Sequence, residues 1–211
     1  MLNLQDSEPL ACGHLRAVYQ HPEQADRLIK IMRPEIVNQR WGGILRWYKR
    51  LPRARHYSGF VRELKEYIAF KARYPQALTS IAPVWGVVET DLGLGLIVQK
   101  IVGPQGDLAP TFKSYIEQYG YTADMAAELK NFFQNLLKSN IVIGDIHLRN
   151  IVYGCELDGP SRLIMIDGFG EKNIIPKCSM SRWINRRNTL RHWRRVEHLA
   201  VTHSSHRTMV S

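Results

Sequence analysis

The protein has 211 residues, with 29 Lys and Arg against 19 Asp and Glu and a formal net charge of +10 at neutral pH. Its 45% hydrophobic and 23% charged residues are typical of a globular protein and exclude a disordered, collagen-like or coiled-coil chain. No apolar run approaches the roughly 18 residues that a membrane span needs, and the first residues lack the basic and apolar regions of a signal peptide. We therefore expect a cytoplasmic protein, and three widely spaced cysteines fit a reducing compartment.

The excess positive charge is confined to two segments. Residues 33–73 contain 11 Lys and Arg against 3 Asp and Glu, and residues 171–211 contain 9 against 2, so the rest of the chain is acidic overall. A local excess of this kind indicates an anionic partner such as phosphate, anionic lipid or nucleic acid. It is equally compatible with a solubilising surface and a basic tail.

The chain begins as β structure. Residues 10–20 and 27–32 predict two strands around a turn at residues 21–26, and Pro34 ends the second strand. Residues 34–59 interleave tryptophans with arginines and lysines, a composition that suits a mobile loop or a partly helical surface insertion.

A helix is predicted next, over residues 60–74. Four apolar residues share one of its faces and two glutamates lie beside it: Val61, Leu64, Ile68 and Ala72, with Glu63 and Glu66. Two β runs follow at residues 81–90 and 94–102, and Asp91–Gly93 between them predicts a hairpin turn.

The longest regular apolar pattern predicts a helix over residues 124–138, ended by Ser139 and Asn140 because Asn tolerates a left-handed backbone. Residues 141–153 and 162–170 are two further β runs. Residues 181–199 predict a C-terminal helix that either packs on the second lobe or lies on a membrane surface as a basic amphipathic helix. Its apolar residues fall roughly on one face: Trp183, Leu190, Trp193 and Val196.

This succession of elements predicts an α+β architecture of two lobes. The first lobe covers residues 1–105 and carries the basic insertion at about residues 34–59. The second, reduced lobe covers residues 106–211.

Three side chains with oxygen atoms stand at the ends of the later β runs: Asp145, Asn150 and Asp167. Mg²⁺ prefers oxygen ligands and keeps several waters, so one carboxylate, one amide oxygen and nucleotide phosphates would suit it. A second carboxylate nearby could accept a proton from a hydroxyl group.

These residues lie in segments that resemble the protein-kinase-like superfamily. GDIHLRNIVY resembles its catalytic loop, in which four residues separate an Asp from an Asn, and IDGFG resembles its Asp-Phe-Gly segment with one glycine inserted. Upstream, RLIKIM is similar to the strand with the phosphate-binding lysine, VRELKEY to the helix whose glutamate pairs with it, and LACGHLRAVY to a degenerate glycine-rich loop. The resemblance implies a minimal two-lobed protein-kinase-like fold with a truncated C-terminal lobe.

A narrower resemblance is to the YrbL family. The similarity rests on the opening from Pro9, the HPE turn, the IKI strand, the RELKEY helix and the VET hairpin, and it covers residues 1 to about 195. It implies a small bacterial cytoplasmic protein tied to the PhoP regulatory network, but it supplies no substrate.

The kinase resemblance implies ATP and Mg²⁺ as cofactors and a role for each motif residue. Lys30 would contact the α- and β-phosphates, Glu63 would fix the Lys30 rotamer, and Gly13 would let the backbone approach the phosphates.

Asn150 and Asp167 would hold Mg²⁺, and Asp145 would orient the attacking hydroxyl and accept its proton. His147 and Arg149 could neutralise charge on the transferred phosphoryl group.

The same residues also have structural interpretations. Lys30 could lie at the surface of an edge strand, and Glu63 could be one of several carboxylates on a helix surface. Asp145, Asn150 and Asp167 could be turn residues that bond to their own backbone. His203 and His206, in a polar tail, would simply be solvated.

Two features depart from the kinase pattern. The basic stretch separates Lys30 from Glu63 by 33 residues, and we expect it at the mouth of the nucleotide cleft. Only 41 residues follow Gly170, so the surfaces that dock peptide substrates are largely missing. The GDIHLRN loop is closer to those of small-molecule kinases.

Three functions are compatible with the sequence. The first is an ATP- and Mg²⁺-dependent phosphotransferase that acts on a hydroxyl group of an unidentified acceptor. The second is a pseudokinase or regulatory nucleotide-binding module, favoured by the single glycine of the phosphate loop and the truncated lobe. The third is a basic protein that binds an anionic membrane surface or, less favoured, nucleic acid, and it rests on charge alone.

Overall fold

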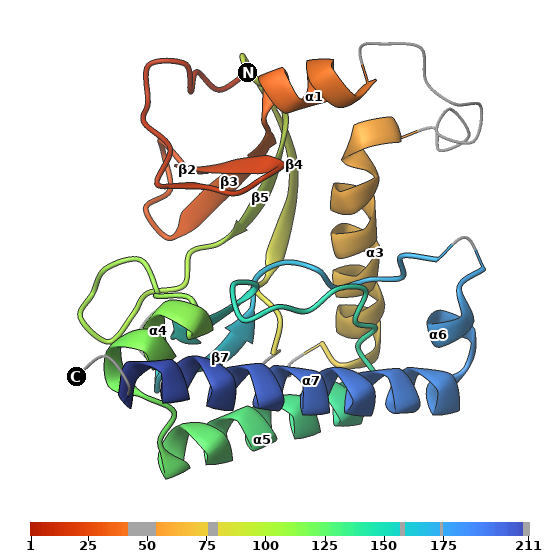
Figure 1. The fold of residues 1–211 in the computed structure, drawn as a ribbon. Helices are drawn as coiled ribbons and strands as arrows, with labels where there is room; N and C mark the ends of the chain where they lie inside the picture. Colours follow the sequence, from red (N-terminus) through yellow and green to blue (C-terminus); the bar gives the residue numbers. More distant parts are fainter. Residues whose placement is uncertain (42–53, 76–79, 157–158, 174, 209–211) are drawn as a thin grey trace. The chain divides into compact units, whose positions relative to one another are not determined.

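The computed structural model describes residues 1–41, 54–75, 80–156, 159–173 and 175–208, which are drawn in colour in Figure 1. The chain divides into two compact units. The first consists of Met1–Leu64 and Pro83–Lys100, and the second of Lys65–Ala82 and Ile101–Ser211.

The first unit is built on a five-stranded antiparallel sheet. Its strands are arranged in the order β1 (Ala11–Cys12), β2 (Arg16–Gln20), β3 (Arg27–Met32), β5 (Gly93–Gln99) and β4 (Val84–Thr90). The predicted strand at residues 27–32 and the β4–β5 hairpin are confirmed. Residues 10–20 form a hairpin rather than one strand, because the chain reverses at Gly13, whose N–H donates to the Arg16 carbonyl at 2.8 Å.

β3 is the central strand of this sheet. Its alternating side chains point to opposite faces, so Ile29 and Ile31 enter a small core with Leu4 while Lys30 points to the other face. Lys30 lies between Val18 of β2 and Leu96 of β5 and is only 5% exposed.

The basic insertion begins with a helix. Pro34 does not merely end the preceding strand: it starts α1 (Pro34–Trp41), where its fixed φ and missing N–H suit a first helical position. The insertion is therefore partly helical, as one of the two alternatives predicted. Residues 42–53 lie outside the described residues, and a short 3-10 helix, η1 (Arg55–Tyr57), precedes the next helix.

α3 (Ser58–Arg73) confirms the predicted helix but buries a different face. The predicted apolar stripe faces solvent, since Val61 and Ile68 are 51% and 57% exposed, whereas Phe60, Glu63 and Phe70 are buried. The rotation of the helix follows from the charge on Glu63: once this carboxylate is buried against cations, its face must be the inner one.

The second unit is mainly helical. It contains α4 (Phe112–Tyr119), α5 (Ala123–Ser139), α6 (Lys177–Met180), α7 (Arg182–Thr208) and a two-stranded antiparallel sheet of β6 (Ile151–Gly154) and β7 (Arg162–Met165). α5 is the helix predicted over residues 124–138, and Asn140 ends it with a φ of 55°. α4 was not predicted, although Thr111 caps its first turn and Gly120 follows its last. Of the β run predicted at 141–153, only the end is a strand.

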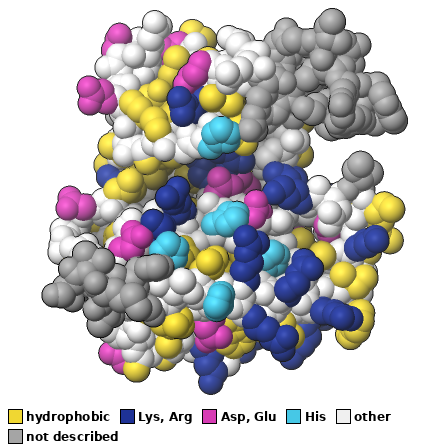
Figure 2. All heavy atoms as spheres, viewed as in Figure 1, with side chains coloured by type: hydrophobic (Ala, Val, Ile, Leu, Met, Phe, Trp, Pro, Cys, Tyr) yellow, Lys and Arg dark blue, Asp and Glu magenta, His cyan; other side chains and the backbone are white. Residues whose placement is uncertain are grey.

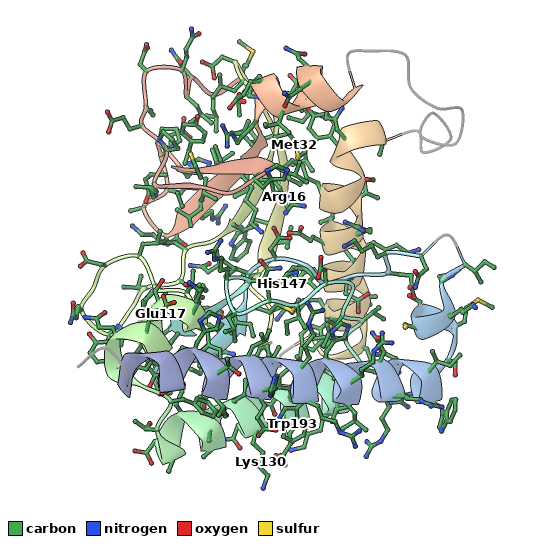
Figure 3. The ribbon with its side chains drawn as sticks, in the orientation of Figure 1. Arg16, Met32, Glu117, Lys130, His147 and Trp193 are labelled. Carbon is green, nitrogen blue, oxygen red and sulfur yellow. The ribbon has the colours of Figure 1, made fainter. Side chains whose placement is uncertain are left out.

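α7 packs against α4 and α5, which supports the packing interpretation of the C-terminal helix (Figure 1). The Trp193 ring stacks on Phe133 of α5, with ring centroids 5.6 Å apart and ring planes 4° from parallel. Figure 3 shows Trp193 between α7 and α5. Trp183, predicted on the same face, is 67% exposed. The buried residues of α7 include two polar ones, Asn185 and Thr189. The predicted face is therefore confirmed at Trp193 and Val196 and wrong at Trp183, and two polar residues complete it.

The fold class is α+β, as predicted: an antiparallel sheet in one unit and mainly helices in the other. Within the described residues, every helix is too short or too polar to cross a membrane.

The two tryptophans of α7 give a matched test of this helix orientation. Trp193→Ala removes the stack on Phe133, and we expect it to lower the free energy of unfolding by about 2–4 kcal/mol. Trp183→Ala, on the exposed side, should change it by no more than about 0.5 kcal/mol. Urea denaturation of both variants measures the difference, and equal effects would contradict the orientation described here.

Candidate functional site

A buried ion pair joins β3 to α3 in the first unit. The Nζ atom of Lys30 lies 3.0 Å from Oε2 of Glu63, and the Glu63 side chain is 2% exposed. Burying a charge is unfavourable unless an opposite charge compensates it. The structure therefore brings two predicted residues together and excludes the interpretations of Lys30 and Glu63 as surface residues.

Glu63 has a second cationic partner, Arg16, which no sequence motif indicated. Nη1 of Arg16 donates to Oε1 of Glu63, and the guanidinium lies 5.0 Å from the centroid of the Phe60 ring. Arg16 is two residues from Val18, which pairs with Lys30, so both cations lie on one face of the sheet. Gly59 makes room for Arg16, because a Cβ at Gly59 would lie 2.4 Å from Nη2.

Gly13 lies in the β1–β2 turn and is exposed. A Cβ there would meet only the Arg16 carbonyl, at an ordinary 3.5 Å. The fold itself does not demand a glycine at this position. A ligand close to the backbone would supply a reason for one.

The other predicted residues lie in two loops of the second unit. The Asp145 loop (residues 141–150) and the Asp167 loop (residues 166–170) run backbone to backbone. The N–H of Asp145 donates to the Gly168 carbonyl and the N–H of Ile166 to the Asn150 carbonyl, both at 2.8 Å. Asp145, Asn150 and the start of the Asp167 loop are thus held together within this unit.

The inserted glycine of IDGFG is the residue on which this contact depends. Gly168 has a φ of +85°, and a Cβ there would lie 1.8 Å from the Asp145 carbonyl oxygen and 3.1 Å from Nδ2 of Asn150. Only glycine fits a left-handed backbone at so close an approach. The extra glycine that distinguishes IDGFG from Asp-Phe-Gly therefore allows the close contact between the Asp167 loop and the Asp145 loop.

Asn150 and Asp167 offer oxygen atoms of the kind that Mg²⁺ prefers. Nδ2 of Asn150 donates to the Asp145 carbonyl at 3.4 Å, and among the described residues nothing donates to its Oδ1. Oδ1 of Asp167 accepts from the N–H of Gly168 at 2.6 Å. The described residues contain no group of three His, Cys, Asp or Glu suited to a metal, so an ion here would need oxygens from a nucleotide or water as well.

The Asp145 carboxylate has two partners. Its Oδ1 lies 2.9 Å from Nε2 of His147, and its Oδ2 lies 2.9 Å from Nζ of Lys172. Partial burial acts to raise the pKa of Asp145, but the hydrogen bond from Lys172 and the nearby charges of His147, Lys172 and Arg195 hold it below its usual value. Asp145 is therefore ionised and able to accept a proton or orient a hydroxyl.

Side chains from two helices position the Asp145 loop. Oε1 of Glu66, in the later part of α3, accepts from the N–H of Val142 at 2.8 Å. Nδ2 of Asn185 donates to the Ile141 carbonyl at 3.2 Å, and Nδ2 of Asn188 donates to the Ile143 carbonyl at 3.0 Å. Glu66 lies one turn after Glu63 on the same helix, but it bonds to the Asp145 loop and not to Lys30. No motif or spacing in the sequence pointed to the two asparagines.

Comparison with known proteins places the chain in a family. Residues 2–199 match the family described as PhoP regulatory network protein YrbL. The chain belongs to the YrbL family. This match confirms the family that the sequence motifs implied. The description of the family names no catalysed reaction.

Two YrbL-family relatives have been named, each as an uncharacterized protein YrbL, from Escherichia coli (strain K12) and Shigella flexneri. Each is 29% identical to this chain over 203 residues, which is 92% of this chain and 86% of the relative. Among solved structures, the PknI kinase domain of Mycobacterium tuberculosis is similar with a TM-score of 0.44 and 14% identity. That match covers 76% of this YrbL-family chain and 56% of the kinase domain, and it assigns no activity.

Gly168 provides a first test of the loop geometry. Gly168→Ala should lower the free energy of unfolding by roughly 2–4 kcal/mol, because it combines backbone strain with a collision against the Asp145 carbonyl. Gly13→Ala is the matched control and should change stability by about 0.5 kcal/mol or less. Thermal or urea denaturation measures both. A tolerated Gly168→Ala would show that the loops are not in contact as described.

Glu66 provides a second test. Burial raises the pKa of Glu66, and the hydrogen bond from Val142 offsets this only in part. Because the folded-state pKa lies above the unfolded one, the native state holds a proton that the unfolded state releases, and stability falls as the pH rises between the two values. Glu66→Gln, which is neutral at every pH, should flatten this dependence.

Glu66→Ala completes the comparison. It leaves the buried N–H of Val142 without its acceptor, and we expect a loss of about 1–3 kcal/mol relative to Glu66→Gln. Urea denaturation between pH 4 and pH 8 measures both effects. Equal stability of the two variants would show that the hydrogen bond does not hold the loop.

Proposed function

We propose that the protein is an ATP- and Mg²⁺-dependent phosphotransferase of minimal kinase-like design that acts on a hydroxyl acceptor. The buried Lys30–Glu63 pair is the observation that carries the proposal. A buried ion pair is often no more stabilising than apolar residues of the same volume, so packing alone gives little reason for it. A lysine held in one rotamer by a glutamate is suited to bind the phosphates of a nucleotide.

The oxygen atoms of the second unit support the same proposal. Asn150 and Asp167 would hold Mg²⁺, because the bond from Nδ2 to Asp145 leaves Oδ1 of Asn150 available. Bound Mg²⁺ would neutralise charge on the phosphates. Two protein ligands are enough for this role, because Mg²⁺ usually keeps waters and phosphate oxygens in its coordination shell.

Asp145 would act on the acceptor. The hydroxyl oxygen of the acceptor forms a bond to the γ-phosphorus as the bond from that phosphorus to the ADP oxygen breaks. The hydroxyl proton passes to the Asp145 carboxylate. The products are ADP and the phosphorylated acceptor, and Lys172 and His147 keep the carboxylate in place.

The regulatory alternative also has a specific observation in its favour. Both oxygens of Asp145 already have partners, His147 and Lys172, and Glu63 is shared between Lys30 and Arg16. A protein that binds nucleotide without transferring phosphate could keep this arrangement unchanged. In either case we infer a cytoplasmic protein with a role in the PhoP network that the family is named for.

The basic C-terminal helix suggests an accessory partner. Arginines are exposed along α7, and Figure 2 shows Lys and Arg side chains gathered over the part of the surface where this helix runs. They would suit an anionic membrane surface better than nucleic acid, because exposed Trp183 and Met180 lie beside them. Binding to a membrane surface would accompany the proposed phosphotransferase activity and would not replace it.

Thermal denaturation with and without Mg-ATP tests nucleotide binding. At a saturating concentration, about one hundred times Kd, the wild type should gain about 2.7 kcal/mol and its Tm should rise by several degrees. Asp167→Ala should lose the Mg²⁺-dependent part of the shift. Lys30→Met should fold, because Arg16 still pairs with Glu63, but should bind nucleotide at least roughly tenfold more weakly.

Turnover separates the enzyme from the regulatory module. Asp145→Asn should keep the thermal shift and lower ATP turnover by about 10²–10⁴-fold. Glu197→Gln, an exposed carboxylate of α7, is the matched control and should change neither. No shift in the wild type would overturn both nucleotide functions, whereas a shift without turnover on any acceptor would leave the regulatory one.

A further inference from the structure

A pocket with a volume of about 620 Å³ lies within the second unit. Three segments form it: Lys113 comes from α4, residues 147–150 from the Asp145 loop, and Leu199 and His203 from α7. The N–H of Lys113 donates to the Leu148 carbonyl at 3.2 Å, which joins α4 to the loop. The volume suits a small molecule rather than a folded partner.

The wall of this pocket is basic. Lys113 and Arg149 are cations, and His147 and His203 become cations on protonation, while among the described lining residues none is acidic. His203 was expected to be solvated. It is instead partly buried, because α7 continues to Thr208 and packs against α4.

Most of this charge already has a counter-charge. Glu117 lies 2.7 Å from Lys113 and 3.7 Å from His203, and Asp145 bonds to His147. Figure 3 shows Glu117 and His147 on the same side of α7. These carboxylates hold the three basic side chains in place.

Arg149 is different. Its side chain is exposed, and its charge helps to lower the pKa of Glu117, but the Glu117 carboxylate is within ion-pair distance of Lys113 and His203 and not of Arg149. A guanidinium presents several N–H donors in a fixed plane that matches carboxylate and phosphate oxygens. An open cation of this kind, in a pocket whose other cations are balanced, provides the charge for an anion.

We propose that this pocket binds the acceptor, and that the acceptor is a small hydroxyl compound with a carboxylate or phosphate group held by Arg149. The inference rests on the proposed function and adds the substrate class. Asn150, proposed as a Mg²⁺ ligand, also lines the pocket. A molecule anchored at Arg149 would therefore have its hydroxyl group close to the atoms of the Asp145 loop.

Binding of inorganic phosphate tests the pocket without any turnover. Phosphate is titrated at constant ionic strength, and the imidazole NMR signals of His147 and His203 are followed. Both should shift in a saturable way. Arg149→Ala should weaken binding roughly tenfold or more, and Arg149→Lys should restore part of it. Arg182→Ala removes an exposed arginine of α7 that is outside the pocket, and it should bind as the wild type does.

Two results of this titration would overturn the inference. One is the absence of saturable shifts in the wild type. The other is an equal loss of affinity in Arg149→Ala and Arg182→Ala, which would indicate a general effect of charge. A parallel titration with acetate separates carboxylate from phosphate as the preferred group.

A turnover assay distinguishes this inference from the proposed function. Glycerol, glycerate and glycerol 3-phosphate are compared as acceptors at one concentration of Mg-ATP. An anionic acceptor should have a kcat/KM at least tenfold above that of glycerol, and Arg149→Ala should remove the preference. Faster reaction with glycerol would refute the inference and support the phosphotransferase. Phosphate binding at Arg149 without turnover of any acceptor would refute the phosphotransferase and keep the anion site.

Discussion

The buried carboxylate of Glu63 is the constraint on which the first unit depends. A charge that is 2% exposed must be compensated, and two strands supply the compensation, with Arg16 from β2 and Lys30 from β3. This requirement turns α3 so that a charged residue faces inward while Val61 and Ile68 remain exposed. It also accounts for Gly59, which leaves space for the Arg16 guanidinium. The inner face of α3 and the position of the proposed phosphate-binding lysine thus depend on one electrostatic condition.

The second unit is organised by backbone contact rather than by charge. Gly168 lets the Asp167 loop approach the Asp145 loop so closely that their amides and carbonyls bond directly. Glu66, Asn185 and Asn188 then bond with their side chains to three further backbone groups of the Asp145 loop. Backbone bonds from three other segments hold the loop in place and so restrict the positions of its side chains. The same loop supplies Arg149 and His147 to the basic pocket.

The positively charged residues have different roles in different parts of the structure. The net charge of +10 suggested only an anionic partner. In the structure, the cations fall into separate groups: Arg16 and Lys30 share a buried carboxylate, Lys172 pairs with Asp145, and Arg149 lines the basic pocket. The arginines exposed along α7 form a further group. A small anionic substrate is therefore compatible with the overall charge, and nucleic acid is not required to explain it.

Local periodicity, turn chemistry and the order of short motifs were enough to predict the strand with Lys30, the β4–β5 hairpin, α5 and the family. Packing between distant segments set the buried face of α3 and the part that Asn185 and Thr189 play in that of α7. A buried ion pair and asparagine bonds to loop carbonyls outweighed the apolar pattern at Val61, Ile68 and Trp183. Packing also decided that Arg16 joins Glu63 and that Lys113, Arg149 and His203 line one pocket. These residues are far apart in the chain, and no local spacing relates them. They come together only when the chain packs, because buried charges and buried polar backbone groups need partners from distant segments.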